Sequence, residues 1–157
     1  MTKFILKMNI KTTRTNSKNK DFINLVRELD AYLKITDEEE HDFYNQFNNI
    51  DVLKEVVVTY VSGIAVGCGA IKKFDNSAVE VKRMFVLKEN RGTGVAQKLL
   101  YELESWATEL GHTKCVLETG IRQIRAVAFY KKSSYKITPN YGQYSGMENS
   151  ICFEKEI

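Results

Sequence analysis

The chain has 157 residues and a mass of 18.1 kDa, the usual size of one domain. Its composition, 43% hydrophobic and 27% charged, is ordinary for a globular protein, and one proline with nine glycines excludes a collagen-like or linker-like chain. A net charge of +3 is too small to indicate a nucleic-acid partner by itself. The longest uncharged stretch, residues 56–71, is shorter than a membrane span and contains a Ser-Gly turn signal. We therefore expect one cytoplasmic domain over residues 1–157, with no membrane or nucleic-acid partner.

The charge is unevenly distributed along the chain. Residues 1–20 contain six basic residues and no acidic ones, whereas residues 21–60 contain ten acidic and three basic residues, a net −7. We interpret the basic start as a first strand over residues 4–10 and a polar loop to residue 20, rather than as a targeting segment. Two histidines without metal-ligand spacing exclude a zinc site. Three cysteines in apolar, strand-like contexts are predicted to be buried and reduced: Cys68, Cys115 and Cys152.

Apolar residues spaced three and four apart predict a first helix over residues 21–35. Thr36 and Glu39 have the spacing of a capping box, which predicts a second, short helix to about residue 47. Segments rich in β-branched residues and joined by short turns then predict three antiparallel strands. These strands cover residues 52–61, 65–74 and 79–86.

The second half of the chain alternates between helix and strand. A long amphipathic helix starts near Val95 and should end at Gly111, a residue suited to the left-handed cap position. The order of elements predicts an α+β fold with a mostly antiparallel sheet and one β-α-β crossover. The remaining expected elements are a strand at residues 115–117, a helix at 123–133, a loop at 139–149 and a strand at 150–155.

The loop of residues 89–96 joins a strand to the long helix and contains Gly92 and Gly94. Small residues let a backbone approach an anion closely, and the free N–H groups and dipole of the helix start attract it. The loop is therefore predicted to bind a phosphate or pyrophosphate, the alternative being a tight turn that needs glycine. No Gly-Lys-Ser/Thr follows, which excludes a P-loop. Gln97 and the preceding antiparallel strands make a dinucleotide-binding fold the weaker interpretation.

The motif Arg91-x-x-Gly94-x-Ala96 resembles the Arg/Gln-x-x-Gly-x-Gly/Ala signature of the GNAT superfamily of acetyl-coenzyme A-dependent N-acetyltransferases. Residues 80–86 and 117–120 resemble the family's fourth strand and the end of its fifth. Residues 126–135, Ala-x-x-Phe-Tyr-x-x-x-Ser-Tyr, resemble the following helix. Ser134 stands where the family usually has glycine, and Ile124 where related bacterial members often have proline. The resemblance implies a GNAT-like α+β fold, a mostly antiparallel mixed sheet with splayed central strands and about four flanking helices.

The same resemblance implies acetyl-coenzyme A as co-substrate and no metal. The backbone of Phe85 and Val86 would bind its pantetheine arm. Tyr130 would be the general acid that protonates the departing thiolate, and a plain core tyrosine is the alternative. The amides expected to bind the pyrophosphate are those of Arg91, Gly92, Thr93, Gly94, Val95 and Ala96.

An attacking amine must first lose a proton. Glu80 matches a position where family members often have a carboxylate, and Glu118 or a water is the alternative base; both carboxylates also suit ordinary salt bridges. The loop before the last strand could form a polar, aromatic acceptor pocket or merely cap the core. Its candidate residues are Tyr141, Gln143, Tyr144, Glu148 and Asn149. Glu118, at the end of the expected fifth strand, is a further candidate for this pocket.

The expected function is transfer of an acetyl group to a primary amine of a small molecule by direct attack. A non-catalytic acetyl-coenzyme A-binding sensor or interaction module, and a peptide or protein N-acetyltransferase, are the alternatives. The net −7 of residues 21–60, expected beside the acceptor groove, favours a cationic acceptor. The sequence leaves a homodimer open.

Overall fold

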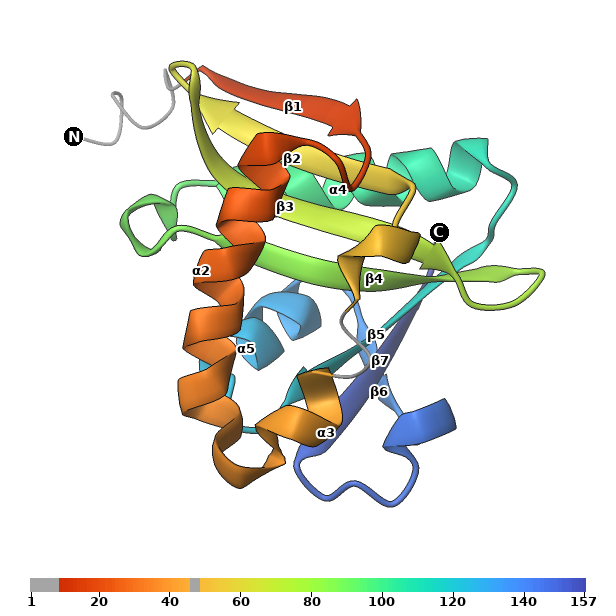
Figure 1. The fold of residues 1–157 in the computed structure, drawn as a ribbon. Coiled ribbons are helices and arrows are strands. Elements are labelled where there is room, and N and C mark those ends of the chain that lie inside the picture. The colour runs from red at the N-terminus through yellow and green to blue at the C-terminus, as the bar shows by residue number, and fades with distance from the viewer. Residues whose placement is uncertain (1–8, 46–48) are drawn as a thin grey trace.

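The computed structural model describes residues 9–45 and 49–157 (Figure 1). A mixed sheet of seven strands forms its centre, in the order β1-β2-β3-β4-β5-β7-β6. The strands are β1 (Ile10–Thr15), β2 (Glu55–Val61), β3 (Ile64–Lys73), β4 (Ala78–Val86), β5 (Lys114–Gly120), β6 (Lys136–Thr138) and β7 (Ser150–Glu156). The α-helices are α2 (Lys20–Asp37), α3 (His41–Asn45), α4 (Val95–Glu109) and α5 (Ile124–Lys132). Four short 3-10 turns are η1 (Glu38–Glu40), η2 (Ile50–Val52), η3 (Lys88–Asn90) and η4 (Gly142–Tyr144).

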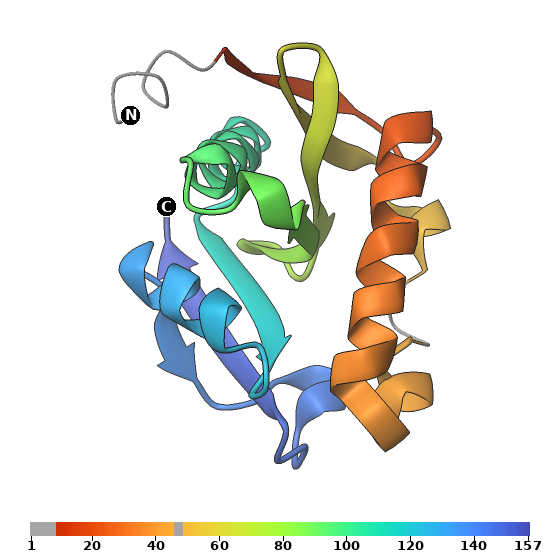
Figure 2. The ribbon, with the colours of Figure 1, turned by 90° about the vertical axis from the view of Figure 1, so that its left-hand side faces the viewer.

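The helices cover both faces of the sheet. Figure 2 shows α2 and α3 on one side and α4 and α5 on the other. Each long helix presents an apolar stripe at the three- and four-residue spacing that its sequence predicts. On α2 the stripe includes Phe22 and Val26, and on α4 it includes Leu99 and Leu103, all nearly or fully buried. The sheet is therefore enclosed by two separate apolar layers.

The sheet opens between its two central strands. Strands β4 and β5 are parallel and pair over three residues, the last pair being Glu80 with Val116. Beyond that pair β4 continues to Val86 with a register irregularity against β3, and Arg83 there has a left-handed φ of 57°. A bulge of this kind bends a strand and increases its twist. The predicted fold class is confirmed: a mostly antiparallel mixed sheet with splayed central strands, of the GNAT type.

Three local predictions differ from the structure. The first strand begins at Ile10, and residues 4–8 of the predicted strand lie outside the described residues. The capping box at Thr36 is wrong, because α2 continues to Asp37 and the Thr36 hydroxyl donates back to the carbonyl groups of Tyr32 and Leu33. Residue 47, the predicted end of the second helix, also lies outside the described residues. The three-residue strand β6, partly exposed along its length, was not predicted.

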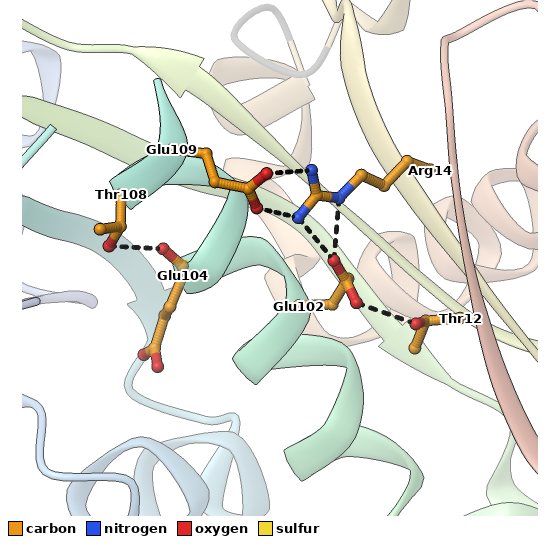
Figure 3. Close-up of polar contacts among 6 residues, drawn as sticks. All are labelled: Thr12, Arg14, Glu102, Glu104, Thr108 and Glu109. Carbon is orange, nitrogen blue, oxygen red and sulfur yellow. Dashed lines mark hydrogen bonds and ion pairs between the residues drawn. The ribbon is translucent and has the colours of Figure 1, made fainter. Parts of the chain in front are cut away.

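Edge strand β1 is fastened to α4 by a charged cluster centred on Arg14 (Figure 3). The Arg14 guanidinium donates to Glu102 at 2.8 Å and to Glu109. Thr12 donates to the other Glu102 oxygen at 3.1 Å. The guanidinium carbon also lies 4.9 Å from the ring centroid of Trp106. These contacts explain how a strand of mostly polar residues is held in the sheet.

The three cysteines are free and buried, as predicted, and lie on β3, β5 and β7. Within residues 9–45 and 49–157 no group of histidine, cysteine, aspartate and glutamate side chains has the arrangement of a metal site. No helix in the same ranges is long and apolar enough to cross a membrane.

Candidate active site

A cavity of about 540 Å³ occupies the opening between β4 and β5. Its wall is built from the second half of α2, from β4 and β5, and from α5 with the turn before it. Because α2 and α5 lie on opposite faces (Figure 2), the cavity passes through the sheet where the two strands separate. The splay of the strands thus creates an internal passage that the sequence alone does not reveal.

One end of this passage meets the glycine loop before α4. Gly94 is the N-cap of α4, with a left-handed φ of 89° and no side-chain cap. Gly92 has a φ of 73°, and an added Cβ at either glycine would enter open space. The first-turn N–H groups of α4 have no acceptor within the helix, and no side chain caps them. A helix start of this kind fits the pyrophosphate of a coenzyme A molecule.

The predicted donor-site residues divide into two groups. Phe85, Val86, Arg91, Gly92 and Ala96 line the cavity. The Arg91 side chain closes the end of β4, since its Nε donates to the Val86 carbonyl at 3.2 Å and its guanidinium carbon lies 5.9 Å from the ring centroid of Tyr32. The other predicted residues lie beside the lining: Thr93 donates to the carbonyl of Asn90, Gly94 caps α4, and Val95 is fully buried in the core.

Tyr130 lies in the cavity wall, on α5, and is 7% exposed. Its ring contacts Phe129, Tyr135 and Phe153, with centroids 5.3, 5.7 and 6.0 Å away. Burial raises the pKa of its hydroxyl group well above the ordinary value. No described residue forms a hydrogen bond with that hydroxyl. Tyr130 is therefore both a core residue and a protonated phenol beside the cavity.

The end of α5 fixes the Tyr130 ring. The N–H groups of Tyr135 and Ser134 donate to the carbonyls of Tyr130 and Lys131, at 3.0 and 3.2 Å, which is the paired bonding of a Schellman cap. Ser134 occupies the left-handed position of this cap, with a φ of 73°. The Tyr135 ring then packs on Tyr130, and its hydroxyl donates to Glu104 at 2.7 Å.

The two candidate bases have different surroundings. Glu80 is 7% exposed, accepts a 2.6 Å hydrogen bond from Tyr141, and lies 3.8 Å from the Lys82 amino group. Glu118 lines the cavity, and burial raises its pKa to about 7 against the opposing effects of a Ser150 hydrogen bond and the Lys82 charge. Burial also lowers the pKa of Lys82. Glu80 is thus engaged by two partners, whereas Glu118 titrates near neutral pH.

The loop before β7 reaches the cavity through Tyr144 and Asn149. Tyr144 is 3% exposed, lines the cavity, and stacks on Tyr44 of α3 with ring centroids 6.3 Å apart. Tyr141 lies next to the lining and contacts it through Glu80. Glu148 is exposed and outside the lining. Burial raises the pKa of both Tyr141 and Tyr144.

Several lining residues at this end were not singled out from the sequence. They lie in segments without a recognisable motif. Whether they line the cavity depends on how α2 and α3 pack on the sheet. Two carboxylates of the acidic run 37–40, which covers the end of α2 and η1, line the cavity. The residues concerned are Asp37, Glu40 and Tyr44.

A sheet opened between parallel β4 and β5, with an uncapped glycine-bearing helix start at the opening, defines the GNAT class of acyltransferases. Residues 22–135 match the family described as the Acetyltransferase (GNAT) family. The chain belongs to this family and is an N-acetyltransferase by class.

Individual relatives align with nearly the whole chain. It is 30% identical to the IAA acetyltransferase of Azospirillum brasilense, over 95% of this chain and 99% of the relative. A candidate acyl-CoA N-acyltransferase from Klebsiella pneumoniae has a similar structure, with a TM-score of 0.79, 28% identity, and coverage of 94% of this chain and 97% of that one. A GNAT family acetyltransferase from Elizabethkingia anophelis, solved with acetyl-CoA bound, shares the fold with a TM-score of 0.69, 18% identity, and coverage of 95% and 99%.

Proposed function

We propose that the protein transfers an acetyl group from acetyl-coenzyme A to the primary amine of a small molecule bound in the cavity between β4 and β5. The observation that supports this most directly is the wall of that cavity, which holds a buried phenol, Tyr130, and a buried carboxyl group, Glu118. A co-substrate bound at the start of α4 would supply the acetyl thioester. The whole of residues 1–157 would act as one catalytic domain.

Tyr130 would be the proton donor. Its burial keeps the hydroxyl protonated at neutral pH, and its contacts with Phe129, Tyr135 and Phe153 hold the ring in place. A departing thiolate in the same apolar surroundings is also a stronger base than in water, because burial disfavours both anions. A fixed phenol can therefore return a proton to sulfur as the carbon–sulfur bond breaks.

Glu118, rather than Glu80, would be the base. A general base works best when its pKa is near the working pH, and burial brings Glu118 to about 7. Glu80 already accepts a hydrogen bond from Tyr141 and lies 3.8 Å from the Lys82 amino group, so it suits a structural role. In this assignment Glu118 takes one proton from the acceptor ammonium group before the neutral amine attacks.

The acceptor end favours a positively charged small molecule. Four carboxylates line the cavity together with Lys82 and four arginines, of which Arg83 pairs with Asp30 and Arg91 closes the end of β4. Carboxylates in the wall attract cationic ligands. Other carboxylates of residues 21–60 are engaged by other side chains. Asp30 forms an ion pair with Arg83, and Asp21 accepts a hydrogen bond from the Tyr60 hydroxyl. The four lining carboxylates are Asp37, Glu40, Glu80 and Glu118.

The test is a thiol-release assay with acetyl-coenzyme A and a panel of polyamines, free amino acids, dicarboxylic amino acids and peptides, at low and high salt. We expect turnover with small cationic amines, slowed by salt. Tyr130→Phe should lower kcat with the best acceptor by about 10²–10⁴-fold while the melting temperature stays the same. Stabilisation by acetyl-coenzyme A with no thiol release for any amine would instead favour a sensor, and a preference for peptides would favour a protein acetyltransferase.

A further inference from the structure

Lys82 places a primary amine in the wall of the cavity, and the proposed transfer reaction gives it no role. Its side chain is 10% exposed, and its ion-pair partner among the described residues is Glu80, with the Nζ atom 3.8 Å from the carboxylate. This distance is too long for a hydrogen bond, and no other described residue forms a hydrogen bond with the Nζ atom. The amine is therefore enclosed by protein but engaged by a single long contact.

The two faces of the sheet show on which side of the opening the Lys82 side chain lies. Val79 and Val81 pack in the apolar layer under α4. Successive residues of a strand point to opposite faces, so Lys82 points to the α2 side, as does its partner Glu80. Ala70, the residue opposite Lys82 on β3, belongs to the apolar layer under α2, which agrees with this placement.

The same reasoning places Glu118 on the α2 side of the neighbouring strand. Cys115 and Leu117 pack in the layer under α4, so Glu118 points the other way, and it lines the cavity. Tyr130 of α5 belongs to the α4 layer. In the proposed reaction the acceptor amine attacks from the side of Glu118 and the thiolate leaves toward Tyr130. The Lys82 amine thus lies on the side of the opening from which an acceptor would attack.

We propose that Lys82 is an internal acceptor, so that the protein acetylates this side chain when acetyl-coenzyme A is bound and no other amine is present. The neutral Nζ atom attacks the thioester carbonyl, a carbon–nitrogen bond forms and the carbon–sulfur bond breaks. The nitrogen gives one proton to Glu118, and the departing thiolate takes one from Tyr130. The amide product is stable, so each chain reacts once and loses one positive charge. The inference rests on the proposed binding of acetyl-coenzyme A in this cavity, and not on the identity of the external acceptor.

Two physical effects favour Lys82 over the exposed lysines. An exposed lysine is almost fully protonated at neutral pH and is a poor nucleophile. Burial lowers the pKa of Lys82, helped by the charges of Lys72 on β3 and Arg83 on β4 and opposed by those of Glu80 and Glu118. A thioester bound in the same cavity also reacts with this amine as a unimolecular pair, which removes the entropic cost of bringing the two together.

The direct test is peptide mapping by mass spectrometry after the protein is incubated with acetyl-coenzyme A and no amine. We expect one acetyl group per chain, on Lys82, with release of one thiol, at a rate per chain that does not depend on protein concentration. Lys82→Arg keeps the positive charge and should lose both. Lys72→Arg is the matched control, because Lys72 lies opposite Glu80 on β3 and is exposed, and it should leave acetylation of Lys82 unchanged. An unmodified Lys82, or acetylation spread over exposed lysines without preference for it, would overturn the proposal.

Gly94→Glu separates the reaction of bound acetyl-coenzyme A from chemical acetylation by the free compound. It should abolish acetylation of Lys82 and leave the slow modification of exposed lysines as it is. A Lys82 rate that Gly94→Glu does not change would contradict the proposal. Mapping of the unaltered chain decides the question even if Lys82→Arg does not fold. If Lys82 is acetylated and no amine of the panel is, the proposed function fails and this inference stands, whereas the reverse result overturns this inference alone.

Discussion

Ser134→Gly should stabilise the protein. Ser134 has a φ of 73°, in the left-handed region, where an L-residue with a Cβ is strained by about 1–2 kcal/mol. Its side chain is exposed and makes no hydrogen bond with any described residue, so little is lost with it. Glycine relieves the strain but adds freedom to the unfolded chain, at a cost of about 0.5–1 kcal/mol. The net gain should be about 0.5–1 kcal/mol, a rise in melting temperature of about 1–4 °C for a chain of this size.

Thermal unfolding followed by circular dichroism measures this directly, with two controls. Ser134→Ala removes the hydroxyl and keeps the strain, so it should leave the melting temperature nearly unchanged. Ser133→Gly, one residue earlier, has a φ of −87° and loses a 2.8 Å hydrogen bond to the Phe129 carbonyl, so it should destabilise. A stabilising effect of Ser134→Ala equal to that of Ser134→Gly would refute the reasoning, because backbone strain would then not be the cause.

Three further predictions concern charge and ligand binding. Glu118→Gln should stabilise the free protein above pH 7 by up to about 3 kcal/mol and have little effect near pH 4. Burial raises the pKa of Glu118 from 4.5 to about 7, so ionisation of this group lowers the free energy of unfolding as the pH rises between these two values. Urea titrations at several pH values measure the difference. Arg14→Ala should cost about 1 kcal/mol, less at high salt, with Arg14→Lys intermediate in the same urea titrations. Acetyl-coenzyme A at 100 times its Kd should stabilise the protein by about 2.7 kcal/mol in a thermal-shift assay, and Gly94→Glu should abolish the shift.

The sequence predicts the fold well where burial follows a regular period. The helices that became α2 and α4 and the strands β2 to β4 have apolar residues at the spacing their elements require, and the expected bounds lie within a few residues of the observed ones. The sequence analysis did not extend the first strand over residues 11–15, because Lys-Thr-Thr-Arg-Thr has no apolar alternation. That segment is held by β2 and by the Arg14 cluster, which are tertiary contacts.

The candidate site was predictable in its motif and unpredictable in its electrostatics. The loop around Gly94 and the position of Tyr130 follow from residue types in order. The choice between Glu80 and Glu118 does not, because it depends on which carboxyl group loses water on folding and which gains partners. The cavity wall from the end of α2 also depends on helix docking, through contacts such as the 2.8 Å hydrogen bond that the Gln123 side-chain amide donates to the Thr36 hydroxyl.

The reactivity of the three buried thiols can be used to measure local unfolding of the sheet. Cys68, Cys115 and Cys152 are each 0% exposed, and burial raises the pKa of each thiol, so almost no reactive thiolate is present at neutral pH. The native enzyme therefore adds little background to a colorimetric measurement of released coenzyme A. Cys68 lies on the β1–β4 side of the splay and the other two lie beyond it, on β5 and β7. Alkylation rates at the three positions would thus record separately how often each half of the sheet unfolds.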